Sequence, residues 1–170
     1  MNLTKKIALG VAVGFFSNFA FAQTLQDGIA SADSHKYANA KQVFNQMITK
    51  SPTAENYFYL GNSYLTQFEP NFELALENFN KGLAADKKSN LNKIGLASVK
   101  LGKGDKSAIT EIQNIISDAR DKDPEVLYRA AEALTLFGGA GNADLAIDFL
   151  NRAVDKSQKN GTPAYYFYTL

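Results

Sequence analysis

The sequence YFYLGNSY at residues 57–64 is followed, after ten intervening residues, by ALENFNKG at residues 75–82. In the first segment, apolar and small residues recur at spacings of three and four, which places them on one face of a helix. In the second segment a small residue, Ala75, stands four positions before a large one, Phe79. Small residues let two helix axes approach closely, and large side chains fill the space that remains. The two segments therefore predict a pair of packed helices.

The same pattern recurs along the chain. Four small residues are separated by 35, 33 and 38 positions, and each is followed four positions later by a large apolar residue. The pairs are Ala40 and Phe44, Ala75 and Phe79, Ala108 and Ile112, and Ala146 and Leu150. The sequence shows no sustained two-residue alternation of the kind that predicts strands. Because one helix pair cannot bury its own apolar face, the pattern predicts an all-α protein in which such pairs stack.

These residues resemble the tetratricopeptide repeat (TPR) family, whose unit of about 34 residues carries W-x₂-L-G-x₂-Y, then A-x₃-F, then P. The clearest copy spans residues 57–82, with Tyr57 in place of the Trp, and Lys87 stands beyond it where the family usually has the Pro. The third and fourth units depart from the pattern at its Tyr position. The resemblance covers nearly all of residues 23–170 and implies an α-solenoid of antiparallel helix pairs, a TPR-like superhelix.

The repeat register divides the chain after residue 22 into four units and the start of a fifth. The expected units are residues 23–53, 54–87, 88–123, 124–161 and 162–170. Asp123 and Pro124 predict a helix start, as an N-cap followed by a proline at the first position. Asp105 and Asn142 are expected to cap the helices that follow glycine turns. The aromatic residues after Pro163 predict either that residues 165–170 dock onto the fourth unit or that the chain is the N-terminal part of a longer protein.

Residues 1–22 have the three parts of a secretory signal peptide. A start with two lysines is followed by an apolar run at residues 7–16 and by the small-residue site AFA at residues 20–22, which predicts cleavage before Gln23. A span of hydrocarbon takes about 20 apolar residues, so this run favours a cleaved signal over an N-terminal anchor. We therefore expect an exported protein, periplasmic or secreted, with no transmembrane segment after cleavage.

Composition excludes several kinds of site. The 170 residues include no cysteine and one histidine, which excludes disulfides, thiolate metal sites, Cys nucleophiles and paired-His metal sites. The 18 Lys and Arg residues nearly balance the 17 Asp and Glu residues. Nucleic-acid binding normally needs a basic face, so we expect no nucleic-acid partner.

No motif in the sequence predicts catalysis. The segment GKGDKS at residues 102–107 superficially resembles a phosphate-binding loop, but that motif needs G-x₄-G-K-[ST] after a strand, and here helices are expected on both sides. His35 lies in a polar turn without a nucleophile pattern. Asp118, Asp121 and Asp123 lack the spacing and the glycine of a calcium loop. We therefore predict that the chain is not an enzyme and has no catalytic residue, metal site or cofactor.

The TPR resemblance implies that the first helix of each unit lines a concave groove for partner peptides. The corresponding positions here are Glu55, Phe58, Asn62, Leu65, Asn92, Leu96, Val99, Tyr128, Glu132 and Thr135. Asn62 matches an asparagine often found in such grooves, whereas the basic residues of the family's carboxylate-clamp subtype are absent from these positions. The apolar members would suit an apolar or amphipathic segment. The alternative interpretation is that several of these side chains pack against neighbouring helices.

Together these features predict a noncatalytic protein–protein interaction scaffold in the bacterial envelope, which binds a protein or peptide partner in its groove. An alternative is that the array is the N-terminal accessory region of a longer enzyme or envelope-anchoring protein whose activity lies beyond Leu170. An independent hydrolase within these residues is disfavoured because no nucleophile pattern is present. The gene sequence past the codon for Leu170 separates the first two hypotheses.

Overall fold

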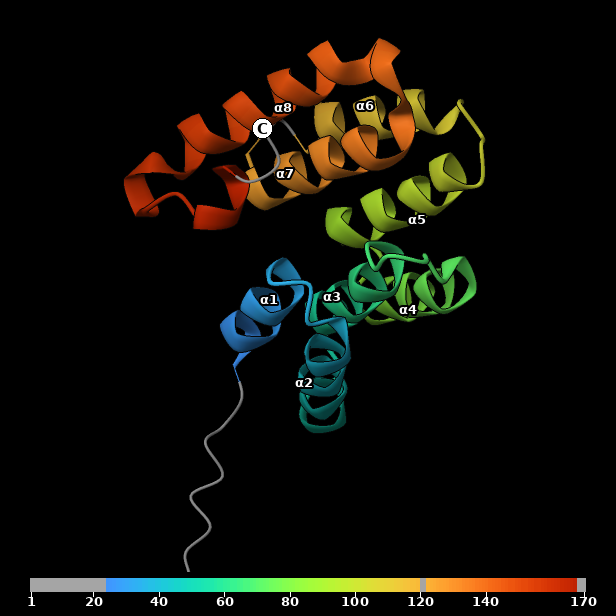
Figure 1. Cartoon of the computed structure of the whole chain (residues 1–170), viewed down its shortest axis with the longest axis vertical. Helices are drawn as coiled ribbons and strands as arrows, with labels where there is room; N and C mark the ends of the chain where they lie inside the picture. Colours follow the sequence, from blue (N-terminus) through green and yellow to red (C-terminus); the bar gives the residue numbers. More distant parts are fainter. Residues whose placement is uncertain (1–23, 120–121, 168–170) are drawn as a thin grey trace, which may run out of the picture.

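The computed structural model describes residues 24–119 and 122–167, which form helices joined by turns, without a strand among them (Figure 1). The α-helices are α1 (Leu25–Asp33), α2 (Tyr37–Lys50), α3 (Ala54–Leu65), α4 (Phe72–Ala85), α5 (Asn90–Gly102), α6 (Ala108–Asp118), α7 (Pro124–Ala133) and α8 (Ala143–Ser157). The shorter elements are the π-helical turn η1 (Leu134–Gly138) and the 3-10 turns η2 (Ala140–Asn142), η3 (Gln158–Asn160) and η4 (Ala164–Phe167). The predicted signal peptide, residues 1–22, lies outside the described residues. Within the described part of the chain, no helix combines the length and apolar character that a membrane span requires.

Successive helices pack as antiparallel pairs: α1 with α2, α3 with α4, α5 with α6, and α7 with α8 (Figure 1). The pairs stack because α2 also contacts α3 and α4 also contacts α5. The first helices of neighbouring pairs contact one another as well, α1 with α3, α3 with α5, and α5 with α7. The predicted all-α solenoid of helix pairs is therefore confirmed.

The first helix of each pair begins at a side chain that caps it. Thr24, Thr53, Ser89 and Asp123 each accept a hydrogen bond from a backbone N–H in the first turn of α1, α3, α5 and α7. A cap of this kind stabilises a helix by about 1 kcal/mol. Pro124 occupies the first position of α7, as the sequence predicts.

The second helices of the third and fourth pairs begin differently from the prediction. Asp105 accepts hydrogen bonds from the backbone N–H and the hydroxyl of Ser107, at 3.0 and 2.6 Å, and Ser107 is the N-cap of α6. Asn142 stands at the N-cap of α8, but its amide donates to the carbonyl of Gly138 at 2.8 Å and caps no N–H of the helix. Both side chains satisfy polar groups of the turn, so the two capping predictions are wrong.

Phe79 shows how small and large residues fit together in the core. Its side chain is fully buried. A Cβ atom at Gly61 on α3 would lie 2.7 Å from Cε1 of this ring, and a Cβ atom at Gly95 on α5 would lie 2.5 Å from it. Any larger residue at either glycine would overlap the ring, so the predicted pairing of small with large residues is confirmed here.

The aromatic segment after α8 docks onto α7. Tyr166 is 1% exposed, and its ring stacks on that of Tyr128 with the ring centroids 4.6 Å apart. Tyr165 meets Tyr128 edge-on at 5.0 Å. The structure shows Tyr165 and Tyr166 docked onto the fourth unit, and the hypothesis that the chain is the N-terminal part of a longer protein stays a prediction. Residues 168–170 lie outside the described part.

Candidate functional site: a cavity between the first and last helix pairs

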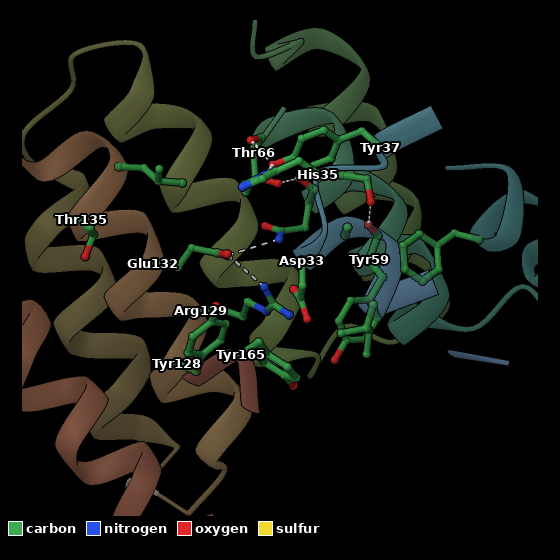
Figure 2. A pocket seen from close by; sticks show the side chains of 16 residues that line it. Asp33, His35, Tyr37, Tyr59, Thr66, Tyr128, Arg129, Glu132, Thr135 and Tyr165 are labelled. Carbon is green, nitrogen blue, oxygen red and sulfur yellow. Dashed lines mark hydrogen bonds and ion pairs between the residues drawn. The ribbon is translucent and has the colours of Figure 1, made fainter. Parts of the chain in front are cut away.

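A cavity of about 330 Å³ lies between segments from the two ends of the chain (Figure 2). We call it the central cavity, and it is lined by α1, α2, α3, α7, η1 and η4 together with turn residues. Asp33 from α1 and Tyr165 from η4 line the same space. Its volume is at the lower end of the roughly 300–1,000 Å³ that is typical of ligand pockets.

Arg129 is the buried cation of the cavity wall. Its side chain is 5% exposed, and its Nε donates to Oε1 of Glu125 at 2.8 Å. Its Nη1 donates to both carboxylate oxygens of Glu132 at 3.1 Å. The guanidinium carbon also lies 4.7 Å from the ring centroid of Tyr128, which is an attractive cation–π contact. Burial disfavours the charged guanidinium, but the carboxylates of Glu132 and Glu125 outweigh this effect and hold the pKa of Arg129 above its ordinary value.

Glu125 does not line the cavity itself but pairs with Arg129, which does, and it accepts hydrogen bonds from three tyrosines. Tyr59 donates to Oε1 at 3.0 Å, while Tyr165 and Tyr166 donate to Oε2 at 2.6 and 3.0 Å. Burial would raise the pKa of this carboxyl group, but the charge of Arg129 and the hydrogen bonds lower it below its ordinary value. Burial and the nearby carboxylate raise the pKa of all three tyrosines. Glu125 is therefore held as a carboxylate, and the tyrosines are held as hydroxyl donors.

Glu125, Arg129 and Glu132, which we call the ion cluster, also join the second helix pair to the fourth. Tyr59 and Asn62 on α3 donate to Glu125 and Glu132 on α7, at 3.0 and 3.2 Å. These bonds cross the face that the first helices form. The two hydrogen bonds therefore link α3 and α7 at the wall of the central cavity.

Asp33 points into the cavity toward Arg129 and Glu132 (Figure 2). The side chain is exposed at the mouth, yet desolvation by the surrounding protein raises its pKa to about 6. The charge of Arg129 opposes this increase, and the charges of Glu132 and Glu125 add to it. The Asp33 carboxylate takes part in none of the hydrogen bonds or ion pairs within the described part of the chain. It is therefore an acid at the cavity whose ionisation is costly, because burial and the charges of Glu132 and Glu125 outweigh the favourable charges of Arg129 and His35.

The rim of the cavity is partly fixed by the turn between α1 and α2. His35 adopts a φ of 57°, which is uncommon for a residue other than glycine. Its Nδ1 lies 3.1 Å from the hydroxyl of Tyr37, which donates to the carbonyl of Thr66 at the end of α3, at 2.8 Å. On the other side of the cavity, Leu136 of η1 is 51% exposed and Thr135 is exposed.

The positions predicted to line a groove divide into three groups in the structure. The buried ones are Phe58, Leu65, Asn92, Val99 and Tyr128. The partly buried ones are Asn62, Leu96 and Glu132, and the exposed ones are Glu55 and Thr135. The central cavity brings together four of these ten positions: Asn62, Tyr128, Glu132 and Thr135. Whether any of them contacts a partner stays a prediction.

Asn92 is one predicted groove residue whose surroundings account for its burial. It is 0% exposed, and its amide donates to the carbonyl of Ala54 at 2.9 Å and to the hydroxyl of Ser89 at 2.8 Å. Its Oδ1 lies against Gly82, where a Cβ atom would come within van der Waals overlap. The side chain therefore connects α5 to α3 and α4 in the core.

Sequence reasoning missed Arg129, Asp33 and Tyr59 as site residues. One signal was available for the first, because Glu125, Arg129 and Glu132 have the spacings of four and three at which helix side chains meet. No comparable signal marks Asp33, whose role depends on where the end of α1 lies relative to α7.

The lining of the central cavity combines charged, polar and apolar side chains. Within residues 24–119 and 122–167, no group of three or more His, Asp or Glu side chains is placed to hold a metal ion. The carboxylates of Asp33 and Glu132 line the cavity with the single guanidinium of Arg129, and Glu125 lies behind it. Negative charge is thus in excess.

Comparisons with known proteins add only to the description of the fold. No protein-family model and no curated protein matches the chain. Among solved structures, two crystal structures of MamA are similar to it, each with a TM-score of 0.47 and 20% sequence identity. Each match covers 80% of this chain and 72% or 77% of the MamA chain. At this level of identity, the similarity concerns the arrangement of the helices alone.

Proposed function

We propose that this chain is a noncatalytic scaffold that binds a segment of a partner protein at the central cavity. The observation that carries the proposal is the cavity itself, whose walls are held by the ion cluster and whose rim carries exposed Leu136 and Thr135. Protein–protein interfaces form their main contacts at sites where an exposed apolar side chain lies beside a preformed polar pocket.

The proposed contact is smaller than an extended apolar groove. Phe58, Leu65 and Val99 are only 1–2% exposed and contribute to the core, so their side chains are not available to a partner. Asn62, Glu132 and Thr135 remain at the cavity. This distribution supports a contact in which a short segment lies across the rim and one side chain enters.

We further propose that the scaffold acts after export, in the periplasm or outside the cell. The signal-like sequence of residues 1–22 supports this location. The near balance of 18 basic and 17 acidic residues supports a protein partner over a nucleic acid.

A pair of matched surface variants tests the proposal. Leu136→Asp places a charge at the cavity rim, and Ile147→Asp places one on α8, outside the cavity lining, at a similar exposure of 47% compared with 51%. Both positions are exposed, so neither change should unfold the protein, which circular dichroism checks. Affinity capture from an envelope extract, followed by mass spectrometry, measures partner recovery for the wild type and each variant.

The expected result is that Leu136→Asp lowers recovery of a specific protein while Ile147→Asp leaves it at the wild-type level. Equal recovery with both variants, or no specific protein with the wild type, would refute binding at this cavity. Phe58→Asp and Tyr128→Asp are unsuitable for this experiment, because both side chains are buried and their replacement would disturb the core.

A further inference from the structure

We propose that the central cavity receives a basic side chain, the guanidinium or ammonium group of an Arg or Lys in an exposed segment of the partner. This inference rests on the proposed scaffold function and deepens it by naming the chemistry of the residue that enters.

The first argument is the charge balance of the wall. Asp33, Glu132 and Arg129 line the cavity, so two carboxylates face one guanidinium, and Glu125 adds a third carboxylate behind it. Arg129 is already bound to Glu125 and Glu132 through its Nε and Nη1. The sum of these charges is negative, and a surface of this sign attracts and orients a cation.

The second argument is the position of Asp33. It lies at the mouth, it is exposed, and it takes part in none of the hydrogen bonds or ion pairs of the described residues. Its raised pKa means that its negative charge destabilises the unbound protein. A cation that entered the cavity would form the direct ion pair that Asp33 does not make with the described residues of the unbound protein, so the cost would be offset on binding. Groups whose charge is unfavourable until a ligand arrives are concentrated at functional sites.

The third argument is the shape and the apolar part of the lining. A cavity of about 330 Å³ has room for one side chain and none for a folded element. Ile29, Ala32 and Leu136 line it together with the acids, and they offer an apolar path for the methylene stem of a Lys or Arg. The face of the Tyr128 ring is already covered by Arg129, so the entering cation is recognised by carboxylates.

The other titratable groups around Asp33 do not reverse this sign. Tyr37, Tyr59 and Tyr165 have raised or strongly raised pKa values because of burial, and they stay neutral at physiological pH. His35 stands at the rim, where its Nδ1 contacts the hydroxyl of Tyr37, and it lowers the pKa of Asp33 by less than burial and the neighbouring carboxylates raise it.

The test is a titration of the isotope-labelled chain with short peptides, followed by amide chemical shifts. Three capped pentapeptides differ only at the central residue, which is arginine, its neutral isostere citrulline, or glutamate. We expect the arginine peptide to bind, with shifts at the end of α1 and at α7 and η1. The citrulline peptide should bind at least about fivefold more weakly, and the glutamate peptide more weakly still.

Two isosteric variants assign the effect to the cavity. Asp33→Asn should weaken binding of the arginine peptide about fivefold or more, while Asp118→Asn, which removes the same charge from the end of α6, should leave it unchanged. Equal affinity for the three peptides, no binding of the arginine peptide, or an unaffected Asp33→Asn variant would overturn the inference. Equally tight binding of free agmatine would overturn the assignment to a polypeptide.

This test separates the two proposals. If capture of a partner depends on Leu136 but not on Asp33, the scaffold proposal stands and the inference of an entering basic side chain is refuted. If the arginine peptide binds but no partner depends on Leu136 for its capture, the inference of a basic side chain stands and the scaffold proposal is refuted.

Discussion

Replacing Arg129 with Met should destabilise the protein strongly, because it would leave two partly buried carboxylates without their cation. The side chains of Glu125 and Glu132 are 16% and 17% exposed, while that of Arg129 is 5% exposed. Met matches much of the length of Arg and fills a similar apolar space, so the main change is the loss of charge and of hydrogen bonds.

The magnitude follows from these contacts. Removing one partner from a buried ion pair typically costs 3–5 kcal/mol. Glu125 keeps the hydroxyl donors of three tyrosines and Glu132 keeps the amide of Asn62, which reduces the cost. We therefore expect a loss of about 3 kcal/mol, a large share of the ~5–15 kcal/mol by which such domains are stable.

The assay is urea unfolding followed by far-UV circular dichroism, since the chain contains no tryptophan to report by fluorescence. Lys81→Met is the control, because Lys81 pairs with Glu77 in an exposed i,i+4 pair at 2.6 Å, and pairs of this kind contribute about 0.5 kcal/mol. Replacing the whole ion cluster, with Glu125→Gln and Glu132→Gln added to Arg129→Met, should recover at least half of the loss. A loss below about 1 kcal/mol for Arg129→Met, or no recovery in the triple variant, would refute the reasoning.

Three further predictions concern the core, the acid at the cavity and the export signal. Gly61→Ala should cost about 1–3 kcal/mol, because its Cβ would lie 2.7 Å from the ring of Phe79, whereas Gly141→Ala, which meets nothing within 4 Å, should change the melting temperature little. Asp33→Asn should stabilise the protein at pH 7.5 by up to about 1 kcal/mol after allowance for the exposure of the side chain. The pKa of Asp33 in the folded protein is about 6, above its ordinary value of 3.8. As the pH falls, the folded protein therefore binds this proton before the unfolded chain does, and the stability that the charge had cost is regained. In thermal unfolding, the stability difference between the variant and the wild type should fade between about pH 6 and 4, and a constant difference would contradict the prediction. Intact mass of the protein purified from a periplasmic fraction should correspond to a chain that begins at Gln23, and an uncleaved mass would contradict the signal prediction.

Much of the fold could be predicted because its determinants are local. The residue pairs Ala75 and Phe79, and Gly61 and Tyr64, lie three or four positions apart, and this spacing places them on one helix face whatever the rest of the chain does. The cap at Asp123 is equally local, since its partners lie within the first turn of α7. By contrast, the caps expected at Asp105 and Asn142 were wrong, because each side chain had a competing partner in the adjoining turn.

The candidate site could be predicted only in part. The resemblance to the TPR family placed Asn62, Glu132 and Thr135 on the helices that meet at the cavity. It also assigned Phe58 and Val99 to the same surface, although both are buried. A helix position specifies a face but not how closely the next helix approaches, and that distance decides whether an apolar side chain is core or surface.

The amino-acid sequence by itself determined that this chain forms stacked helix pairs, with glycines such as Gly61 and Gly95 where the ring of Phe79 must fit. Only the tertiary structure decided that Asp33 of α1, Tyr59 of α3, Arg129 of α7 and Tyr165 of η4 surround one cavity. The physical reason is that helix formation depends on contacts within a few residues, whereas the cavity depends on the accumulated tilt of successive pairs. Each tilt is set by how the side chains of two helices interlock, and no local pattern encodes their sum.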